Sequence, residues 1–282
     1  MIVGNDISSA QGVINWGFYK NNTNFVIMKA TEGVGFTDPA FKVNQLAARQ
    51  AGLPTGYYHF ARPDLNNSPI DEAEWFLNNV GTLWEGEFLC LDYEVSWPGD
   101  CVAWCKIFMD QVSGRLNGLK SLIYLNQSLV KAHNWQPIVD ANYGLWVAAY
   151  TYDPNKNVFT TGSWKSAVMQ QWTDDETVPG IAGKVDGDVF FGDVVALKAY
   201  GYHFPVSEPT PTPEPSPAPS VPTGTTLPTP DPQILALQQQ NKDLLAENIQ
   251  LKLDKAQLAL ELLNCQKNPF YAIGRWLSGL FS

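Results

Sequence analysis

A short apolar run, Phe88 to Leu91, leads into two acidic residues that are two positions apart, Asp92 and Glu94. On a β-strand, residues i and i+2 project to the same side, with Cα atoms roughly 6.6 Å apart. Two carboxyl groups held that close cannot both ionise freely, so one keeps a raised pKa and can donate a proton while the other stays charged. Hydrolysis of a glycosidic bond needs this division of roles. Two solvated loop acids share the same spacing, so the surrounding elements must decide between the two interpretations.

Eight short apolar runs of this kind recur and are expected to form strands. They are residues 2–6, 25–30, 55–61, 88–94, 121–125, 145–149, 167–172 and 188–191. Stretches compatible with helices lie between the early runs, at residues 39–50, 70–80 and 101–116. Strands that alternate with helices predict parallel pairing, and eight such strands predict a closed barrel. Because the later connections are short or irregular, we expect an α/β fold, a modified (β/α) TIM-like barrel with eight strands and fewer than eight helices.

Polar and aromatic residues collect at the carboxyl ends of these predicted strands, where a β/α barrel places its chemistry. Besides Asp92 and Glu94, the candidates are Asp6, Lys29, Tyr58, His59, Tyr124, Trp146, Gln171, Trp172 and an aspartate at position 186 or 188. Aromatic faces pack against sugar rings while acids and amides bind hydroxyl groups, so the set predicts a carbohydrate groove. Some members have structural alternatives. His59 suits a hydrogen-bonded core histidine, Lys29 suits the partner of a buried acid, and the two tryptophans suit core packing.

The composition narrows the class of partner. The formal net charge is −10, and no cluster of Lys and Arg is visible, which argues against a nucleic-acid ligand. Four cysteines form no metal-binding pattern, so neither a metal nor another cofactor is expected. Residues 1–6 lack the basic and apolar regions of a signal peptide, and no run of 18 apolar residues predicts a membrane span. The expectation is synthesis in the cytoplasm, with release by some other agent.

Six segments, in this order, resemble the glycoside hydrolase family 25 lysozymes, the muramidases of phage endolysins and of secreted bacterial and fungal enzymes. They are Asp6–Gly12 with Ile14–Trp16, Met28–Gly33, Gly56–Phe60, Leu91–Glu94, Leu145–Ala148 and Gln170–Trp172. The resemblance spans the stretch that carries the eight apolar runs. Because six ordered motifs match, it is far more specific than any one of them.

The resemblance implies cleavage of the β-1,4 bond between N-acetylmuramic acid and N-acetylglucosamine in bacterial peptidoglycan. By motif, Glu94 would be the general acid, and Asp92 would stabilise positive charge directly or by orienting the substrate's 2-acetamido group. Asp6 would support this pair. A fourth acid is expected near the last strand, where counting back from Phe190 favours Asp186 over Asp188. Lys29, Tyr58, His59, Tyr124, Trp146, Gln171 and Trp172 would bind substrate.

The composition changes abruptly after the predicted barrel, residues 1–204. Residues 205–232 contain 11 prolines and predict an extended linker. Residues 233–268 carry a heptad repeat that includes Leu237, Asn241, Leu244, Asn248, Leu251, Leu258 and Leu262. Leu at the d positions with Asn at two a positions predicts a parallel coiled coil and a homo-oligomer, with a dimer favoured over a lone helix packed on the barrel. The apolar segment 269–282 is too short to span a bilayer, and contact with a membrane or cell-wall surface is left open for it.

Two main functional hypotheses follow from these patterns, and a weaker third is a glycosidase that acts on another N-acetylated polymer such as chitin. The first is a cell-wall hydrolase of the phage endolysin or virion lysin type, which reaches the wall with a holin or with the virion. The second is a non-catalytic peptidoglycan-binding or virion structural protein built on the same barrel. Retention of Asp6, Asp92, Glu94 and a fourth acid favours the enzyme, because a binding protein has no need of acids that are costly to hold together.

Overall fold

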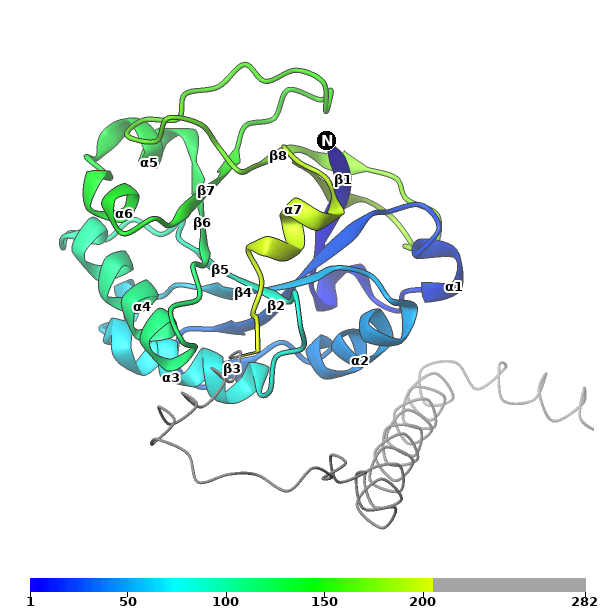
Figure 1. Cartoon of the computed structure of the whole chain (residues 1–282), viewed down its shortest axis with the longest axis horizontal. Coiled ribbons are helices and arrows are strands. Elements are labelled where there is room, and N and C mark those ends of the chain that lie inside the picture. Colours follow the sequence, from blue (N-terminus) through cyan, green and yellow to red (C-terminus); the bar gives the residue numbers. More distant parts are fainter. Residues whose placement is uncertain (205–282) are drawn as a thin grey trace, which may run out of the picture. The chain divides into compact units, whose positions relative to one another are not determined.

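The computed structural model describes residues 1–204, which form one nine-stranded sheet with helices packed along part of its outer face (Figure 1). The strands are β1 (Ile2–Ile7), β2 (Phe25–Glu32), β3 (Phe36–Thr37), β4 (Thr55–Phe60), β5 (Phe88–Asp92), β6 (Leu122–Asn126), β7 (Gly144–Ala148), β8 (Met169–Glu176) and β9 (Val185–Phe190). Their order in the sheet is β1-β9-β8-β7-β6-β5-β4-β2-β3, and β1 also pairs with β2. This second pairing closes eight strands into a barrel, while β3 adds a two-residue hairpin partner to β2. The predicted eight-stranded barrel with fewer than eight helices is confirmed.

The last strand differs from the all-parallel arrangement that the sequence predicted. β9 runs antiparallel to both of its neighbours, β8 and β1. Only residues 177–184 connect β8 to β9, which is too short for the helical crossover that parallel neighbours require. The start of β9, rather than its end, therefore lies beside the carboxyl ends of the other barrel strands. Residue pairing places Asp186 opposite Asp6.

The helices follow the predicted end signals. They are α1 (Trp16–Tyr19), α2 (Phe41–Ala51), α3 (Pro69–Val80), α4 (Cys101–Arg115), α5 (Gln127–Ala132), α6 (Gln136–Asp140) and α7 (Val194–Ala199), with 3-10 turns at η1 (Ser9–Gln11) and η2 (Pro63–Leu65). The side chain of Asp100 accepts a hydrogen bond from the backbone N–H of Ala103 and so caps α4. Gly52 ends α2 at φ 73°, a left-handed conformation that glycine adopts without strain. These three longest helices, α2, α3 and α4, match the three helical stretches expected from the sequence.

Alternation along the strands divides the buried residues into two layers. Phe88 and Cys90 of β5 project into the barrel, where they pack with residues such as Tyr124 and Trp146. Leu89 and Leu91 project outward into the layer between sheet and helices. Asp92 continues the inward row, so the same alternation that builds the core aims this acid into the barrel mouth. Helix α7 crosses the opposite end of the barrel (Figure 1), and its Leu197 packs with the inner layer.

The predicted linker (205–232), coiled coil (233–268) and terminal segment (269–282) lie outside the described residues. Within residues 1–204, Cys90, Cys101 and Cys105 are buried free thiols. None of the helices in this part of the chain has the length and apolarity needed to cross a membrane.

Candidate active site

A hollow of about 220 Å³ opens where the carboxyl ends of the strands meet the start of β9. It is lined by Asp6, Lys29, Tyr58, Phe60, Asp92, Glu94, Tyr124, Trp146, Tyr150, Gln171 and Asp186. The four acids that the sequence interpretation favoured therefore lie together, although they come from three strands far apart in the chain. Most of the predicted substrate-binding residues are there as well. We call this hollow the acid pocket.

The carboxyl groups of Asp92 and Glu94 are neighbours in the acid pocket and each affects the pKa of the other. Strand β5 ends at Asp92, yet Glu94 still falls on the same side of the chain, as the spacing predicted. Burial, followed by repulsion from Glu94 and Asp6, raises the pKa of Asp92 well above its ordinary value, and burial also raises the pKa of Glu94. Because two such groups in contact cannot both be charged cheaply, the pair holds one proton. Asp92 is the inner, 6 % exposed member, whereas Glu94 is open to solvent.

Asp6 and Asp186 are bridged by one amide. The Nε2 group of Gln171 donates to Asp6 Oδ2 at 2.8 Å and to Asp186 Oδ2 at 3.3 Å. Burial and repulsion from Asp186 raise the pKa of Asp6 to about 8, while burial and the charges of Asp174 and Glu94 raise the pKa of Asp186 to about 6. Asp6 therefore holds its proton to a higher pH than Asp186 does.

Gln171 is held in this orientation from its other side. Its Oε1 atom accepts hydrogen bonds from the hydroxyl groups of Tyr124 at 2.8 Å and Tyr150 at 3.0 Å. The amide can therefore present only its N–H groups to the acids. Two tyrosines and one glutamine thus fix where Asp6 and Asp186 point.

Asp188 lies deeper in the barrel than Asp186 and does not line the acid pocket. Its side chain is fully buried, and Trp146 Nε1 donates to its Oδ1 atom at 2.9 Å. Burial, followed by the nearby carboxyl groups of Asp6 and Asp186, raises the pKa of Asp188 well above its ordinary value. Of the two alternatives left open by the sequence, Asp186 is the one that faces the pocket, and Asp188 supports Asp6 from below as a neutral acid.

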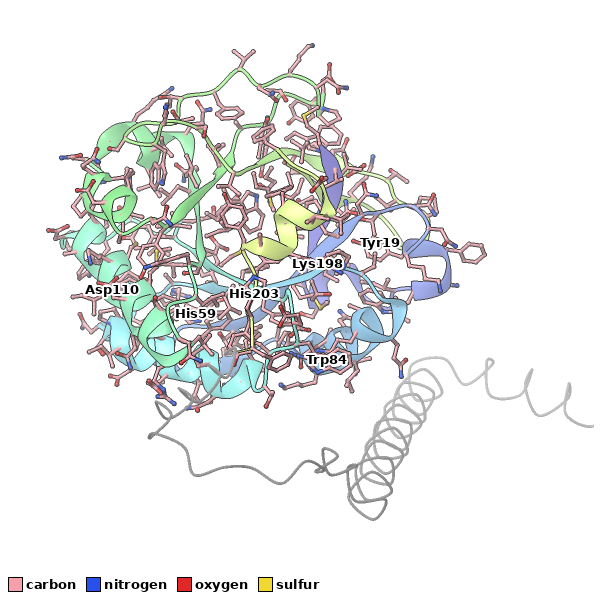
Figure 2. The ribbon with its side chains drawn as sticks, in the orientation of Figure 1. Tyr19, His59, Trp84, Asp110, Lys198 and His203 are labelled. Atoms are coloured by element: carbon pink, nitrogen blue, oxygen red, sulfur yellow. The ribbon has the colours of Figure 1, made fainter. Side chains whose placement is uncertain are left out.

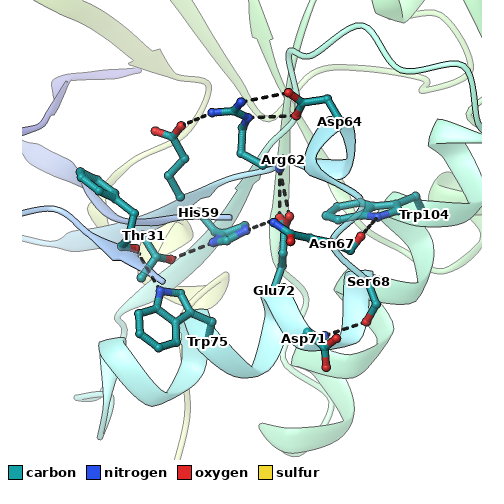
Figure 3. A network of polar contacts seen from close by, with 12 residues as sticks. Thr31, His59, Arg62, Asp64, Asn67, Ser68, Asp71, Glu72, Trp75 and Trp104 are labelled. Carbon is teal, nitrogen blue, oxygen red and sulfur yellow. Dashed lines mark hydrogen bonds and ion pairs between the residues drawn. The ribbon is translucent and has the colours of Figure 1, made fainter. Parts of the chain in front are cut away.

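Lys29 brings a positive charge to the acid pair. Its Nζ atom contacts Glu32 Oε2 at 2.7 Å and lies 4.9 Å from the centre of the Phe60 ring. Arg62 holds the other oxygen of Glu32 at 2.7 Å and is itself paired with Asp64 (Figure 3). The charge of Lys29 lowers the pKa values of both Asp92 and Glu94, against the stronger effect of burial. Lys29 therefore fits both interpretations, because it forms an ion pair with Glu32 and also lines the acid pocket.

His59 does not lie in the pocket, so the prediction that it binds substrate is wrong. It is fully buried, its Nε2 atom is 2.7 Å from Glu72 Oε2, and its Nδ1 atom is 2.8 Å from Thr31 Oγ1 (Figure 3). Burial lowers the pKa of His59, so the ring is neutral and links β4 to α3. Alternation explains the outcome, because Tyr58 and Phe60 project into the barrel and His59 projects away from it.

Trp172 is the second predicted substrate contact that lies elsewhere. It follows the inward-facing Gln171 on β8, and its ring lies so close to Gly187 that a Cβ atom there would come within 2.9 Å of it. Two pocket residues were missing from the predicted set, Phe60 and Tyr150. The signal for both was present in the sequence, since Phe60 shares the strand face of Tyr58 and Tyr150 directly follows the predicted strand at residues 145–149.

Within residues 1–204, no group of three or more His, Cys, Asp and Glu side chains is arranged to hold a metal ion. The chemistry that the pocket offers comes from its own carboxyl groups, those of Asp6, Asp92, Glu94 and Asp186, whose pKa values are all raised. Carboxyl groups of this kind provide the acid and the charged partner that glycosidases use, and the neighbouring aromatic rings can pack against a sugar.

The family model of glycosyl hydrolases family 25 matches residues 5–181, which include Asp6, Asp92 and Glu94. The chain therefore belongs to glycosyl hydrolases family 25. The match ends before Asp186, so the assignment of the fourth acid depends on the geometry above.

Particular relatives are similar over the same region. An autolytic lysozyme of Clostridium acetobutylicum is 30% identical over 198 residues, which are 66% of this chain and 55% of that protein. An N,O-diacetylmuramidase of Chalaropsis is 28% identical, over 67% of this chain and 95% of that protein. Among solved structures, the CTP1L endolysin has a TM-score of 0.61 and 28% identity, over 71% of this chain and 70% of that chain. The chain thus spans little more than half of the Clostridium lysozyme.

Proposed function

We propose that this chain is a muramidase that hydrolyses the β-1,4 bond between N-acetylmuramic acid and N-acetylglucosamine in bacterial peptidoglycan. The family membership, the lysozyme and muramidase relatives and the acid pocket all support this activity. The observation that carries the proposal is the pair of neighbouring carboxyl groups, Asp92 and Glu94, which line the acid pocket at the end of β5 and both have raised pKa values. A pair that holds one proton contains both a general acid and a charged partner.

Glu94 acts as the general acid in this proposal. It is the solvent-open member of the pair and lies at the mouth of the pocket, where the leaving oxygen of a bound glycan would approach. A sugar that covers Glu94 removes water from it and raises its pKa further, which moves the shared proton from Asp92 toward Glu94. The proton then passes from Glu94 to the glycosidic oxygen as the bond to the anomeric carbon breaks.

Asp92 acts on the sugar ring. Its Oδ1 atom is buried and has no hydrogen-bond partner within residues 1–204. An acetamido N–H on the substrate would satisfy this oxygen and hold the acetamido carbonyl beside the anomeric carbon, where positive charge develops. Once the proton has moved to Glu94, the carboxylate of Asp92 also stabilises that charge. De-N-acetylated peptidoglycan should accordingly be cleaved much more slowly than the acetylated polymer.

The decisive experiment is a digest of purified peptidoglycan with the wild type and with Glu94→Gln, followed by reduction and mass spectrometry of the fragments. We expect fragments with reducible N-acetylmuramic acid ends from the wild type, and a rate about 10²- to 10⁴-fold lower with the variant. Glu74→Gln is the matched control, since Glu74 is partly exposed, paired with Arg115 and outside the pocket. A Glu94→Gln variant that digests at the wild-type rate would remove Glu94 from the acid role. Binding to peptidoglycan without fragments from any variant would favour the non-catalytic alternative.

We further propose that the chain acts on the cell wall as a dimer, with residues 233–268 as the oligomerisation segment. The heptad repeat in the sequence is the support for the dimer, and the similarity to an endolysin supports release to the wall with a holin or a virion. Two linked barrels on one polymer gain avidity without new contacts. A chain ending at Phe204 should be an active monomer by light scattering, and a dimeric product would show that the heptads do not assemble the protein.

A further inference from the structure

A second cavity lies at the end of the barrel opposite the acid pocket. Its volume is about 610 Å³, within the range of sites for small organic ligands. Its walls come from the loops that precede β6, β7 and β8 and from the segment at the end of α7, which crosses this end of the barrel (Figure 1). Figure 2 shows His203 of that segment near the barrel axis. We call this cavity the basal pocket.

The charged residues that line the basal pocket are all basic. Lys120, Lys165 and His203 line it, and no Asp or Glu is among the described residues that do so. His203 is paired with Glu85 at 2.5 Å, which raises its pKa. Neither lysine forms an ion pair with a residue in the 1–204 range. Because Glu85 offsets the charge of His203, the positive charge at this cavity comes from the two lysines, and it favours an anionic ligand.

Lys120 is the better placed of the two lysines. It is partly buried, and its Nζ atom lies 4.9 Å from the centre of the Tyr143 ring. The ring holds the ammonium group by a cation–π contact without neutralising it. Tyr143 is fixed in turn, because its hydroxyl group donates to Asp110 at 2.8 Å and its backbone carbonyl accepts from Trp164 Nε1 at 2.9 Å. A positive charge is therefore held at the wall of the cavity and remains free to bind an anion.

The remaining lining indicates what carries the anion. Asn117, Asn142 and Ser166 present side chains that form no hydrogen bond with other residues of the 1–204 region, and these groups suit hydroxyl partners. Leu116 and Val139 add apolar surface beside them. A bare inorganic ion would leave most of such a cavity unused. A molecule with a phosphate, several hydroxyl groups and short carbon segments would use all of it.

We propose that the basal pocket binds a polyol phosphate repeat of an anionic wall polymer, with the phosphate on Lys120 and Lys165 and the hydroxyl groups on the asparagine and serine side chains. This inference rests on the proposed function only in placing the protein at the cell wall. The pocket gives the barrel an attachment point distinct from the acid pocket. One phosphodiester can then be held at one end of the barrel while a glycan strand is cleaved at the other.

The test compares binding to two wall preparations from one source, one intact and one stripped of phosphodiester-linked polymers by acid extraction. The full chain with Glu94→Gln, which leaves the wall undigested, is sedimented with each preparation, alone or with Lys120→Gln and Lys165→Gln added. We expect the two lysine changes to weaken binding to intact walls at least tenfold and to leave binding to stripped walls unchanged. Lys20→Gln with Lys131→Gln, the same change of charge outside the pocket, should not weaken binding.

A direct measurement uses soluble poly(glycerol phosphate) in calorimetry with the full chain. Heat of binding that disappears with the two pocket substitutions and returns with Lys120→Arg and Lys165→Arg supports the proposal. Unchanged binding to intact walls overturns it, and an equal loss on intact and stripped walls shows a peptide or glycan ligand instead. A separate assay tells the two proposals apart. It measures digestion of a soluble peptidoglycan oligosaccharide by the Lys120→Gln, Lys165→Gln variant with Glu94 left unchanged. The rate of digestion by this variant should equal that of the wild type. If neither protein digests the oligosaccharide, the muramidase proposal is refuted, and the binding measurements still test the ligand of the basal pocket.

Discussion

Replacing Asp6 with Asn should make the barrel more stable, and increasingly so as the pH rises. Asp6 is 8 % exposed and has its pKa raised from 3.8 to about 8 by burial and by Asp186. Between these two pH values the folded chain keeps a proton on Asp6 that the unfolded chain releases. The free energy of unfolding must therefore fall as the pH rises through this window. An asparagine carries no such proton, so its contribution does not change with pH.

The magnitude follows from the two pKa values. The folded chain binds the proton on Asp6 about ten-thousandfold more tightly, which corresponds to a loss of about 6 kcal/mol above pH 8 and about 4 kcal/mol at pH 7. These are upper bounds, because Asp6 shares its proton with neighbouring acids and the loss is divided among them. The asparagine oxygen can still accept from Gln171, whose Nε2 lies 2.8 Å from Asp6 Oδ2, so little is lost in exchange. We expect a gain of about 2 kcal/mol or more at pH 8 and much less at pH 5.

Urea unfolding of the full chain at pH 5, 7 and 8.5, followed by tryptophan fluorescence, measures this difference. A gain of that size moves the midpoint by about 1 M. Asp71→Asn removes an exposed carboxyl group at the start of α3 and should show no comparable gain. An Asp6→Asn variant whose stability changes with pH as steeply as that of the wild type would refute the assignment of the proton. The Asp6→Asn variant should also lose most of its hydrolytic activity. Together the two results would show that Asp6 serves catalysis and lowers the stability of the folded chain.

Two further substitutions test the groups beneath the pocket. Asp188→Asn should keep the wild-type dependence of kcat/KM on pH, because a neutral amide replaces a neutral acid. Asp188→Ala should lower kcat, because it removes the group that supports Asp6. A shifted pH profile with Asp188→Asn would mean that Asp188 is charged. Glu72→Ala should lower the free energy of unfolding by about 2–4 kcal/mol, since it leaves the ring N–H of His59 and the backbone N–H of Arg62 without acceptors in the core. Thermal unfolding checks the second expectation, and a melting temperature equal to that of the wild type would show that this network contributes little.

The sequence determined the barrel and most of its site. Apolar runs with polar ends marked all eight barrel strands, because strand burial and strand ends leave a local signal in residue type. The i and i+2 spacing placed Asp92 and Glu94 on one side even though β5 ends at Asp92. The error at His59 was an error of strand face rather than of strand position. Stricter use of alternation would have replaced His59 with Phe60.

The tertiary structure alone decided the chemistry of the acids. Both Asp186 and Asp188 project inward from β9, and only the antiparallel register with β1 places Asp186 at the pocket and Asp188 below it. The raised pKa values of Asp6 and Asp92 depend on burial and on charges from strands up to 180 positions away in the sequence. The basal pocket likewise gathers Lys120, Lys165 and His203 from three separate segments. Residue types and local periodicity can be read along the chain, but a proton affinity depends on all the neighbours in space, and those neighbours exist only once the barrel has closed.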